Sequence, residues 1–297
     1  MSRFRLSPES SIIAVPSNAQ VLSPQPDRSR TAPPSTGSRM TFTGIIGTIC
    51  WFPLRAIIAL CVALRIHPNV LTLVGVIINI GAAWALGMRR FLLAGVVMIV
   101  ANIFDFIDGK VAHELHLESS FGAFWDSTLD RFSDLALFTG LIYLYSTLGR
   151  TDYVMIASIT LIFTIMTSYA RARAESLVEK CKVGFMERPE RIVLFMIGAF
   201  TNRFAGVLWV ILSLSVLTVA NRIYYTYLAL NNVPMPTRDG VRGAFNRAFF
   251  WTDQRTTLPY DLWVLSILGF VWLVPPDWLA DPTAFGPGLL GIITRWF

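Results

Sequence analysis

Charged residues are scarce in this chain, and cysteines are few. Only 15% of its 297 residues are charged, whereas 54% are hydrophobic, a balance that excludes an ordinary soluble domain. The three cysteines, Cys50, Cys61 and Cys181, form neither a CxxC pair nor an even set, so we assign them no disulfide or metal role. The composition predicts an integral membrane protein.

The N-terminal residues 1–39 lack the continuous apolar core of a secretory signal. They are rich in Ser and Pro and carry basic residues, so we predict a disordered basic tail. Met40 directly precedes the first amphipathic stretch, and we hypothesise that translation begins there.

Apolar segments follow one another through most of the remaining chain. Residues 40–66 are broken by Pro53 and carry Arg55 and Arg65, which favours an amphipathic helix at the membrane interface. A six-span core is predicted over residues 67–228, because apolar segments approach the length needed for roughly 30 Å of hydrocarbon. The second predicted span begins at 91 and runs into an acidic segment at 105–130. The other spans are 67–88, 122–149, 152–177, 191–201 with its polar first turn, and 205–228.

The C-terminal extension, residues 229–297, is polar at first and then offers one short apolar stretch at 260–275. That stretch is short for a span. We favour an interfacial or re-entrant helix, with a seventh span as the alternative, and derive no role for the extension. The expected fold is thus an all-α membrane protein with six spans, an interfacial helix before them and an extra C-terminal helix.

The net charge of +6 fits membrane orientation and anionic substrates better than a nucleic-acid partner, because the basic residues gather on one side of the predicted spans. The positive-inside rule places that side in the cytoplasm and predicts a multi-pass protein of the cell (inner) membrane. The acidic segment lies on the same side. One side carries Lys110, Arg171, Arg173, Lys180, Lys182, Arg188, Arg191 and Arg222, and the other carries Arg89, Arg90, Arg150 and Arg203.

Four aspartates, Asp105, Asp108, Asp126 and Asp130, stand within the acidic segment. Helical spacing lets two helices present two carboxylates each across a shared groove. Such acids are costly in a membrane unless they are neutralised, and hard oxygen ligands favour Mg²⁺ or Mn²⁺. Two ions about 4 Å apart could clamp a pyrophosphate.

Small residues on the same helix faces, Gly109, Ala112 and Gly122, would let a phosphate-bearing ligand approach the backbone. Two alternatives remain open at this point. The acids could form structural ion pairs, or they could belong to a transporter, although transporter sites usually lie near the midplane between repeated halves. We find no internal repeat.

The segment from Asp108 to Asp130 resembles the signature of the CDP-alcohol phosphatidyltransferases, D-G-x2-A-R-x8-G-x3-D-x3-D, and Asp105 matches an additional upstream aspartate common in that family. The resemblance extends over about residues 44–228. It implies that Asp105, Asp108 and Asp126 bind two divalent cations, Mg²⁺ or Mn²⁺, and that Asp130 bridges metal and nucleophile as general base. It also implies homodimers, and it places the CDP moiety near Asn69, Thr72, Gly109, Ala112 and Gly122.

His113 is the one departure from the signature, which has arginine there. By the resemblance this position contacts the CDP phosphates, and a neutral imidazole offers one donor where guanidinium offers five. Binding of the CDP phosphates is therefore either weaker, or the missing positive charge is supplied by another residue, for example Lys110. A His that merely fills a helix face is the alternative.

Four arginines flank the predicted turn between the fourth and fifth spans. Converging arginines suit a phosphate group, which they grip with paired donors, although ordinary cytoplasmic flanking charge is the alternative. We predict that they bind an acceptor phosphate, with Glu175, Glu187 and Glu190 holding them in place. The arginines are Arg171, Arg173, Arg188 and Arg191.

This arginine-rich run resembles the bacterial phosphatidylinositol-phosphate synthases and their archaeal relatives. The resemblance implies an enzyme of phospholipid biosynthesis that transfers the phosphatidyl group of CDP-diacylglycerol to a phosphorylated polyol, inositol 1-phosphate in first place, and releases CMP. Phosphatidylglycerophosphate synthesis, or serine or inositol as acceptor, stays open within the family. A transporter or a non-catalytic scaffold is the alternative outside it.

Overall fold

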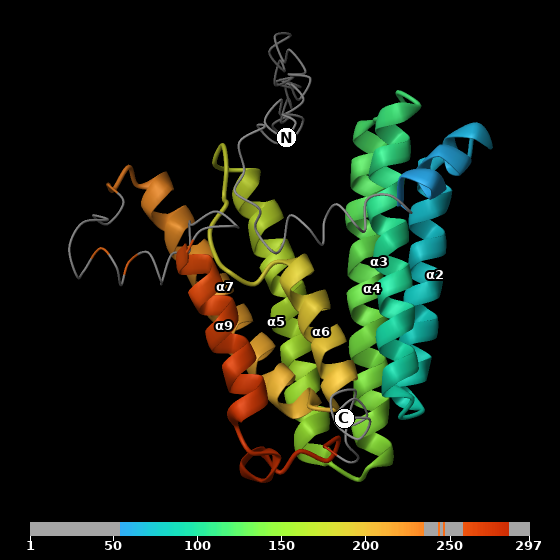
Figure 1. Cartoon of the computed structure of the whole chain (residues 1–297). Coiled ribbons are helices and arrows are strands. Elements are labelled where there is room, and N and C mark those ends of the chain that lie inside the picture. The colour runs from blue at the N-terminus through green and yellow to red at the C-terminus, as the bar shows by residue number, and fades with distance from the viewer. Residues whose placement is uncertain (1–53, 235–242, 244–245, 247–257, 285–297) are drawn as a thin grey trace, which may run out of the picture. The chain divides into compact units, whose positions relative to one another are not determined.

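The computed structural model describes residues 54–234, 243, 246 and 258–284, and the regular elements in this part of the chain are helices (Figure 1). The predicted tail at 1–39 and the first part of the predicted interfacial segment, up to residue 53, lie outside the described residues. The elements are α2 (Pro68–Gly87), α3 (Phe91–Glu114), α4 (Ser120–Thr147), α5 (Thr151–Glu175), α6 (Arg188–Thr201), α7 (Phe204–Leu230), α9 (Leu258–Leu273) and the 3₁₀ helix η2 (Pro276–Leu279).

Local sequence signals account for where these helices begin and end. Pro68 begins α2, and the side chain of His67 accepts a hydrogen bond from the backbone N–H of Asn69; proline is tolerated in a first turn because its missing N–H is not needed there. Ser119 caps α4 by accepting from the Gly122 N–H at 3.0 Å. Asn202 ends α6 in the left-handed conformation, which asparagine adopts more readily than most residues.

Six helices, α2 to α7, occupy the six positions where the sequence predicts spans. Four of them, α2, α3, α5 and α7, are long and apolar enough to cross a membrane. The helix α6 has only 14 residues, and α4 carries three acids, Asp126, Asp130 and Asp134. The described part of the chain is therefore that of an all-helical multi-pass membrane protein.

The helices pack so that α3 and α4 lie side by side with α2, while α6 packs against α3 and α7, and α5 against α4 and α7. One large apolar cluster fills the bundle, with fully buried Leu86, Phe138, Tyr145 and Phe204 among its members. At Gly140 a side chain would collide with the backbone of Ala83. Glycine thus permits the close approach of α4 to α2 that aligns their ends.

A short helix, Leu54–Ala63, precedes α2 and covers the same end of the bundle as the aspartates. Its Ile58 and Cys61 are buried in a cluster with Ile107 and Val111 of α3. Most of its other side chains are exposed. Apart from Arg55 these exposed side chains are apolar, so the amphipathic interfacial helix expected at residues 40–66 stays a prediction.

The described C-terminal segment contacts the N-terminal ends of α5 and α7. Arg203 donates to the Trp272 carbonyl at 2.7 Å, and Arg150 donates to the Ala280 carbonyl at 2.6 Å. Asp281 accepts from the N–H of Ala205 at the start of α7. The helix α9 runs alongside α7 (Figure 1). With 16 residues it falls among the shorter apolar helices, and both the interfacial or re-entrant helix and the seventh span stay predictions.

Candidate metal and phosphate site

Three of the four predicted aspartates converge where α3 meets α4. Asp105 and Asp108 of α3 and Asp126 of α4 each offer a carboxylate oxygen, and these oxygens lie within 4.8 Å of one another. Asp108 is buried and the other two are half-buried. Oxygens from several carboxylates at such separations are the donor set that Mg²⁺ and Mn²⁺ prefer, so these residues fit a divalent cation.

The helix α2 supports this cluster through Thr72 and Asn69. The hydroxyl of Thr72 donates to Asp108 Oδ2 at 2.5 Å. The Asn69 carbonyl accepts from Trp125 of α4 at 3.2 Å, and the Asn69 side chain lies next to Gly122. The structure therefore brings Asn69, Thr72 and Gly122 together beside the acids, as the resemblance implied for the CDP moiety.

Arg188 links the fourth aspartate to the cluster. Its Nη1 lies 3.0 and 2.9 Å from the two oxygens of Asp105 and 2.9 Å from Asp130 Oδ1. The packing of α6 against α3 brings this guanidinium to the acids. A residue predicted to hold the acceptor phosphate thus lies directly against two predicted metal ligands.

The remaining positions of the signature lie on the outer part of α3. A side chain at Gly109 would meet open space, and Ala112 is half-buried, so a ligand can approach this face of the helix. His113 pairs with Glu118 at 3.0 Å, and both side chains are more than half exposed. The structure does not bring His113 into contact with the aspartates of the cluster.

The other three predicted arginines have different surroundings. Arg171 contacts Glu175 and Glu187, each at 3.1 Å. Arg173 is exposed and donates to Ser176. Of the three glutamates expected to hold the arginines, Glu175 and Glu187 do so, whereas Glu190 accepts from Tyr260 of α9.

Arg191 is buried inside the bundle rather than open to a ligand. Its guanidinium forms an ion pair of 2.7 Å with Asp134 of α4, and the two side chains are only 3% and 7% exposed. It also donates to Thr167 of α5. These partners on α4 and α5 hold the guanidinium inside the bundle, an arrangement that does not favour the predicted direct binding of the acceptor phosphate by Arg191.

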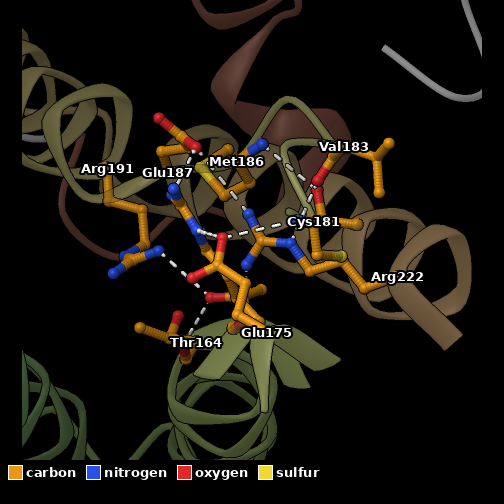
Figure 2. Close-up of polar contacts among 11 residues, drawn as sticks. Thr164, Glu175, Cys181, Val183, Met186, Glu187, Arg191 and Arg222 are labelled. Atoms are coloured by element: carbon orange, nitrogen blue, oxygen red, sulfur yellow. Dashed lines mark hydrogen bonds and ion pairs between the residues drawn. The ribbon is translucent and has the colours of Figure 1, made fainter. Parts of the chain in front are cut away.

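Arg222 of α7 completes the arginine network and was not singled out from the sequence. It donates to the carbonyls of Val183 and Thr167, at 3.0 and 2.5 Å, and its Nη2 lies 3.8 Å from Glu187. Figure 2 shows its guanidinium directed into the loop that carries Cys181, Val183 and Glu187. A charged residue within a predicted span indicates a function or a buried partner. Arg222 and Asp134 both lie within predicted spans, so this criterion could have identified them from the sequence.

Cys181 lies in the same loop and is fully buried. Burial raises the pKa of its thiol, because the charged thiolate is poorly solvated there. The thiol therefore stays protonated at neutral pH and acts as a small apolar side chain.

Comparisons with known proteins point to one family. A family model described as CDP-alcohol phosphatidyltransferase matches residues 65–225. The archaetidylinositol phosphate synthase of Pyrococcus horikoshii is 34% identical over 173 residues, which cover 58% of this chain and 89% of that protein. The phosphatidylinositol phosphate synthase of Mycobacterium tuberculosis is 33% identical over 168 residues, covering 53% of this chain and 77% of that enzyme.

Solved structures agree with the sequence comparisons. The crystal structure of the M. tuberculosis phosphatidylinositol phosphate synthase with CDP-DAG bound has a TM-score of 0.57 and 26% identity, over 62% of this chain and 98% of that chain. The same enzyme in complex with manganese and citrate has a TM-score of 0.57 and 27% identity, over 64% and 97%. The fold is therefore shared over almost the whole length of that enzyme, and the present chain extends beyond it.

Proposed function

Because this chain belongs to the CDP-alcohol phosphatidyltransferase family, we propose that it transfers the phosphatidyl group of CDP-diacylglycerol to inositol 1-phosphate and releases CMP. The relatives described above are named as synthases of inositol phosphate lipids, which favours this acceptor over glycerol 3-phosphate, serine or inositol. The chain is a transferase of phospholipid biosynthesis, and its helices and charge pattern suit a lipid substrate held at a bilayer surface.

We assign cation binding to Asp105, Asp108 and Asp126, with Asp130 as an additional ligand. The proposal rests on the three carboxylate oxygens that lie within 4.8 Å of one another. Arg188 links Asp130 to this cluster. Bound Mg²⁺ or Mn²⁺ would polarise the pyrophosphate of the CDP-lipid and offset the charge of the acids. Asn69, Thr72, Gly109, Ala112, His113 and Gly122 are proposed to surround the CDP moiety.

Asp130 is proposed to act as general base. Its carboxylate lies beside the three-acid cluster, to which Arg188 links it, and it would take the proton from the acceptor hydroxyl. The hydroxyl oxygen then forms a bond to the phosphorus that bears diacylglycerol, and the bond from that phosphorus to the CMP oxygen breaks. The proton stays on Asp130 until solvent removes it, and CMP leaves with its phosphate.

Arg171 and Arg188 are the proposed direct ligands of the acceptor phosphate, because their side chains are 33% and 18% exposed and both lie at the cytoplasmic end of the predicted spans. Arg173, which is exposed two residues after Arg171 on α5, would add a long-range attraction. Arg191 and Arg222, each with a side chain 3% exposed, would support the site from within. Arginines suit this task because they present paired donors to phosphate oxygens.

We further propose that α2 to α7 cross the inner membrane six times with the site facing the cytoplasm, and that the protein acts as a homodimer. The charge distribution in the sequence supports the orientation. The family resemblance supports the dimer. Crosslinking in native membranes would test the dimer, and a labelling reagent that cannot cross the membrane would test the side on which the site lies.

The experiment that tests the reaction is CMP release from CDP-diacylglycerol by the purified protein with Mg²⁺ or Mn²⁺. Inositol 1-phosphate should support the fastest release, with glycerol 3-phosphate, serine and inositol compared in parallel. Asp130→Asn should lower turnover by roughly 100-fold or more, the usual contribution of a general base. An Asp130→Asn enzyme with near-normal turnover would contradict the assignment, and Asp277→Asn, an exposed acid in η2, is the matched control.

A further inference from the structure

Two consecutive residues at the start of α6, Glu187 and Arg188, contact different parts of the site. Glu187 contacts arginines, and Arg188 contacts aspartates. The carboxylate of Glu187 accepts a hydrogen bond from Arg171 at 3.1 Å and lies 3.8 Å from Arg222. The guanidinium of Arg188 contacts Asp105 and Asp130, each at 2.9 Å. An anion thus lies among arginines, and a cation lies among aspartates.

Each of these side chains has the charge of the ligand that its surroundings would bind. The arginines around Glu187 would attract a phosphate group, and the aspartates around Arg188 would attract a metal cation. The side chains of Arg188 and Asp130 are only 18% and 19% exposed, so their attraction is screened less than that of a surface pair. These internal ion pairs compete with the two ligands.

The contacts of Arg188 are also one-sided. A single nitrogen, Nη1, makes all three of its short contacts to Asp105 and Asp130. Its Nε is buried and has no hydrogen-bond partner among the described residues. Because Nε is unsatisfied here, a shift of the guanidinium toward a bound anion would cost little at this atom and could satisfy it.

We propose that Glu187 and Arg188 are internal counter-ions which a phosphate group and a divalent cation displace together, so that the two ligands bind cooperatively. A cation on Asp105 or Asp130 repels the guanidinium, which then becomes available to the phosphate. A phosphate on Arg171 repels the Glu187 carboxylate, whose movement carries the backbone of the next residue. This coupling rests on the proposed function, because it involves the same cation and acceptor sites.

The alternative is a static arrangement, in which Arg188 orients Asp105 and Asp130 for the cation and Glu187 orients Arg171 for the anion. The two accounts predict opposite effects of removing each charge. If the side chains compete with the ligands, removal strengthens binding of the matching ligand. If they orient the site, removal weakens it.

The test is Mn²⁺ binding to the full-length protein in lipid nanodiscs, followed by the electron paramagnetic resonance signal of free Mn²⁺, without any CDP-lipid. Sulfate serves as the phosphate-like probe, and chloride at equal ionic strength is its control. Sulfate should tighten Mn²⁺ binding to the wild-type protein about 5-fold or more, a normal size for coupling between two sites. Arg188→Gln should bind Mn²⁺ about 10-fold more tightly without sulfate and lose the sulfate effect.

Glu187→Gln should respond to sulfate at concentrations several-fold lower than the wild type. Arg188→Lys, which keeps the charge, should retain an Mn²⁺ affinity close to the wild-type value. The matched controls are Lys182→Gln and Glu179→Gln, which remove the same charges from exposed positions in the same loop and should leave both effects unchanged.

The proposal is overturned if Arg188→Gln weakens Mn²⁺ binding or matches Lys182→Gln, or if sulfate has no effect on the wild type. Thermal unfolding of each variant in nanodiscs identifies misfolded protein. If Arg188→Gln is misfolded, Arg188→Lys replaces it: an Mn²⁺ affinity close to the wild-type value supports competition by charge, and weaker Mn²⁺ binding overturns it. Because the assay contains no CDP-lipid and measures no turnover, failure of the coupling leaves CMP release intact. Failure of CMP release, in turn, leaves the coupling measurable.

Discussion

Thr72 of α2 donates a hydrogen bond of 2.5 Å to the buried carboxylate of Asp108 on α3. The bond fixes one oxygen of Asp108 and joins the helix after the N-terminal segment to the acidic cluster. Partners of metal-ligating carboxylates hold the ligand in the orientation that the metal needs. Thr72 lies in a helix that contains no acidic residue, yet this bond makes it a partner of the candidate cation site.

Thr72→Val should lower Mn²⁺ affinity by about 10-fold to 100-fold, the usual effect of removing the partner of a metal ligand. Valine keeps the shape of threonine but cannot donate to Asp108. Thr147→Val, which removes a hydroxyl bonded to a backbone carbonyl at the far end of α4, should leave Mn²⁺ binding unchanged. Equal affinity in the two variants would show that Thr72 does not support the cation site.

His113→Arg should lower the KM for CDP-diacylglycerol several-fold, because guanidinium offers more donors to the CDP phosphates than imidazole does. His113 is exposed and paired with Glu118, so Glu118→Gln is the matched variant that frees this position without adding a donor. The measurement is CMP release at varied CDP-lipid. An unchanged KM in His113→Arg would mean that this position does not contact the phosphates.

Arg191→Met should destabilise the protein by about 3–5 kcal/mol, the usual cost of leaving one partner of a buried ion pair unpaired. The reason is that Asp134, with a side chain 7% exposed, would keep a buried charge. Thermal unfolding in detergent measures the change. Asp152→Asn, at an exposed ion pair, should alter the unfolding temperature little.

The double variant Arg191→Met with Asp134→Leu provides the second half of this prediction. Replacing both partners removes the uncompensated charge, so the loss should be much smaller than in Arg191→Met alone. A double variant as unstable as the single one would contradict a direct ion-pair role. Because Arg191 lies away from open surface, its main effect is expected on stability rather than on the KM for the acceptor.

Arg203→Met should lower the unfolding temperature by a few degrees, equivalent to about 1–2 kcal/mol. The change removes the bonds from Arg203 to the carbonyls of Val271, Trp272 and Val274, of which the bond to Trp272 is the shortest at 2.7 Å. Mn²⁺ binding should stay at the wild-type level, because this end of the bundle is remote from the acids. Arg90→Met, at an exposed arginine, is the control, and equal stability of the two variants would contradict the role of this contact.

The sequence predicted the positions of the six helices well, because apolar length is a local signal, although it missed the Ser119 cap and began the third span at residue 122 instead of 120. It also predicted the three acids that converge, since helical spacing places Asp105 beside Asp108. It treated the arginines as one phosphate-binding group, whereas the structure buries Arg191 against Asp134 and leaves Arg171 and Arg188 partly exposed. The direction in which an arginine points depends on how α6 packs against α3 and α4, and spacing along one helix cannot supply that information.

Transfer of a phosphatidyl group to inositol 1-phosphate can be tested by measuring the mass of the lipid product. The purified protein would receive CDP-diacylglycerol, Mn²⁺, and inositol 1-phosphate and glycerol 3-phosphate at equal concentrations. We predict phosphatidylinositol phosphate as the main product, with one CMP released per lipid, and neither product from Asp126→Asn. Phosphatidylglycerophosphate as the main product would contradict inositol 1-phosphate as the acceptor, and lipid product formed by Asp126→Asn at the wild-type rate would contradict the role of Asp126.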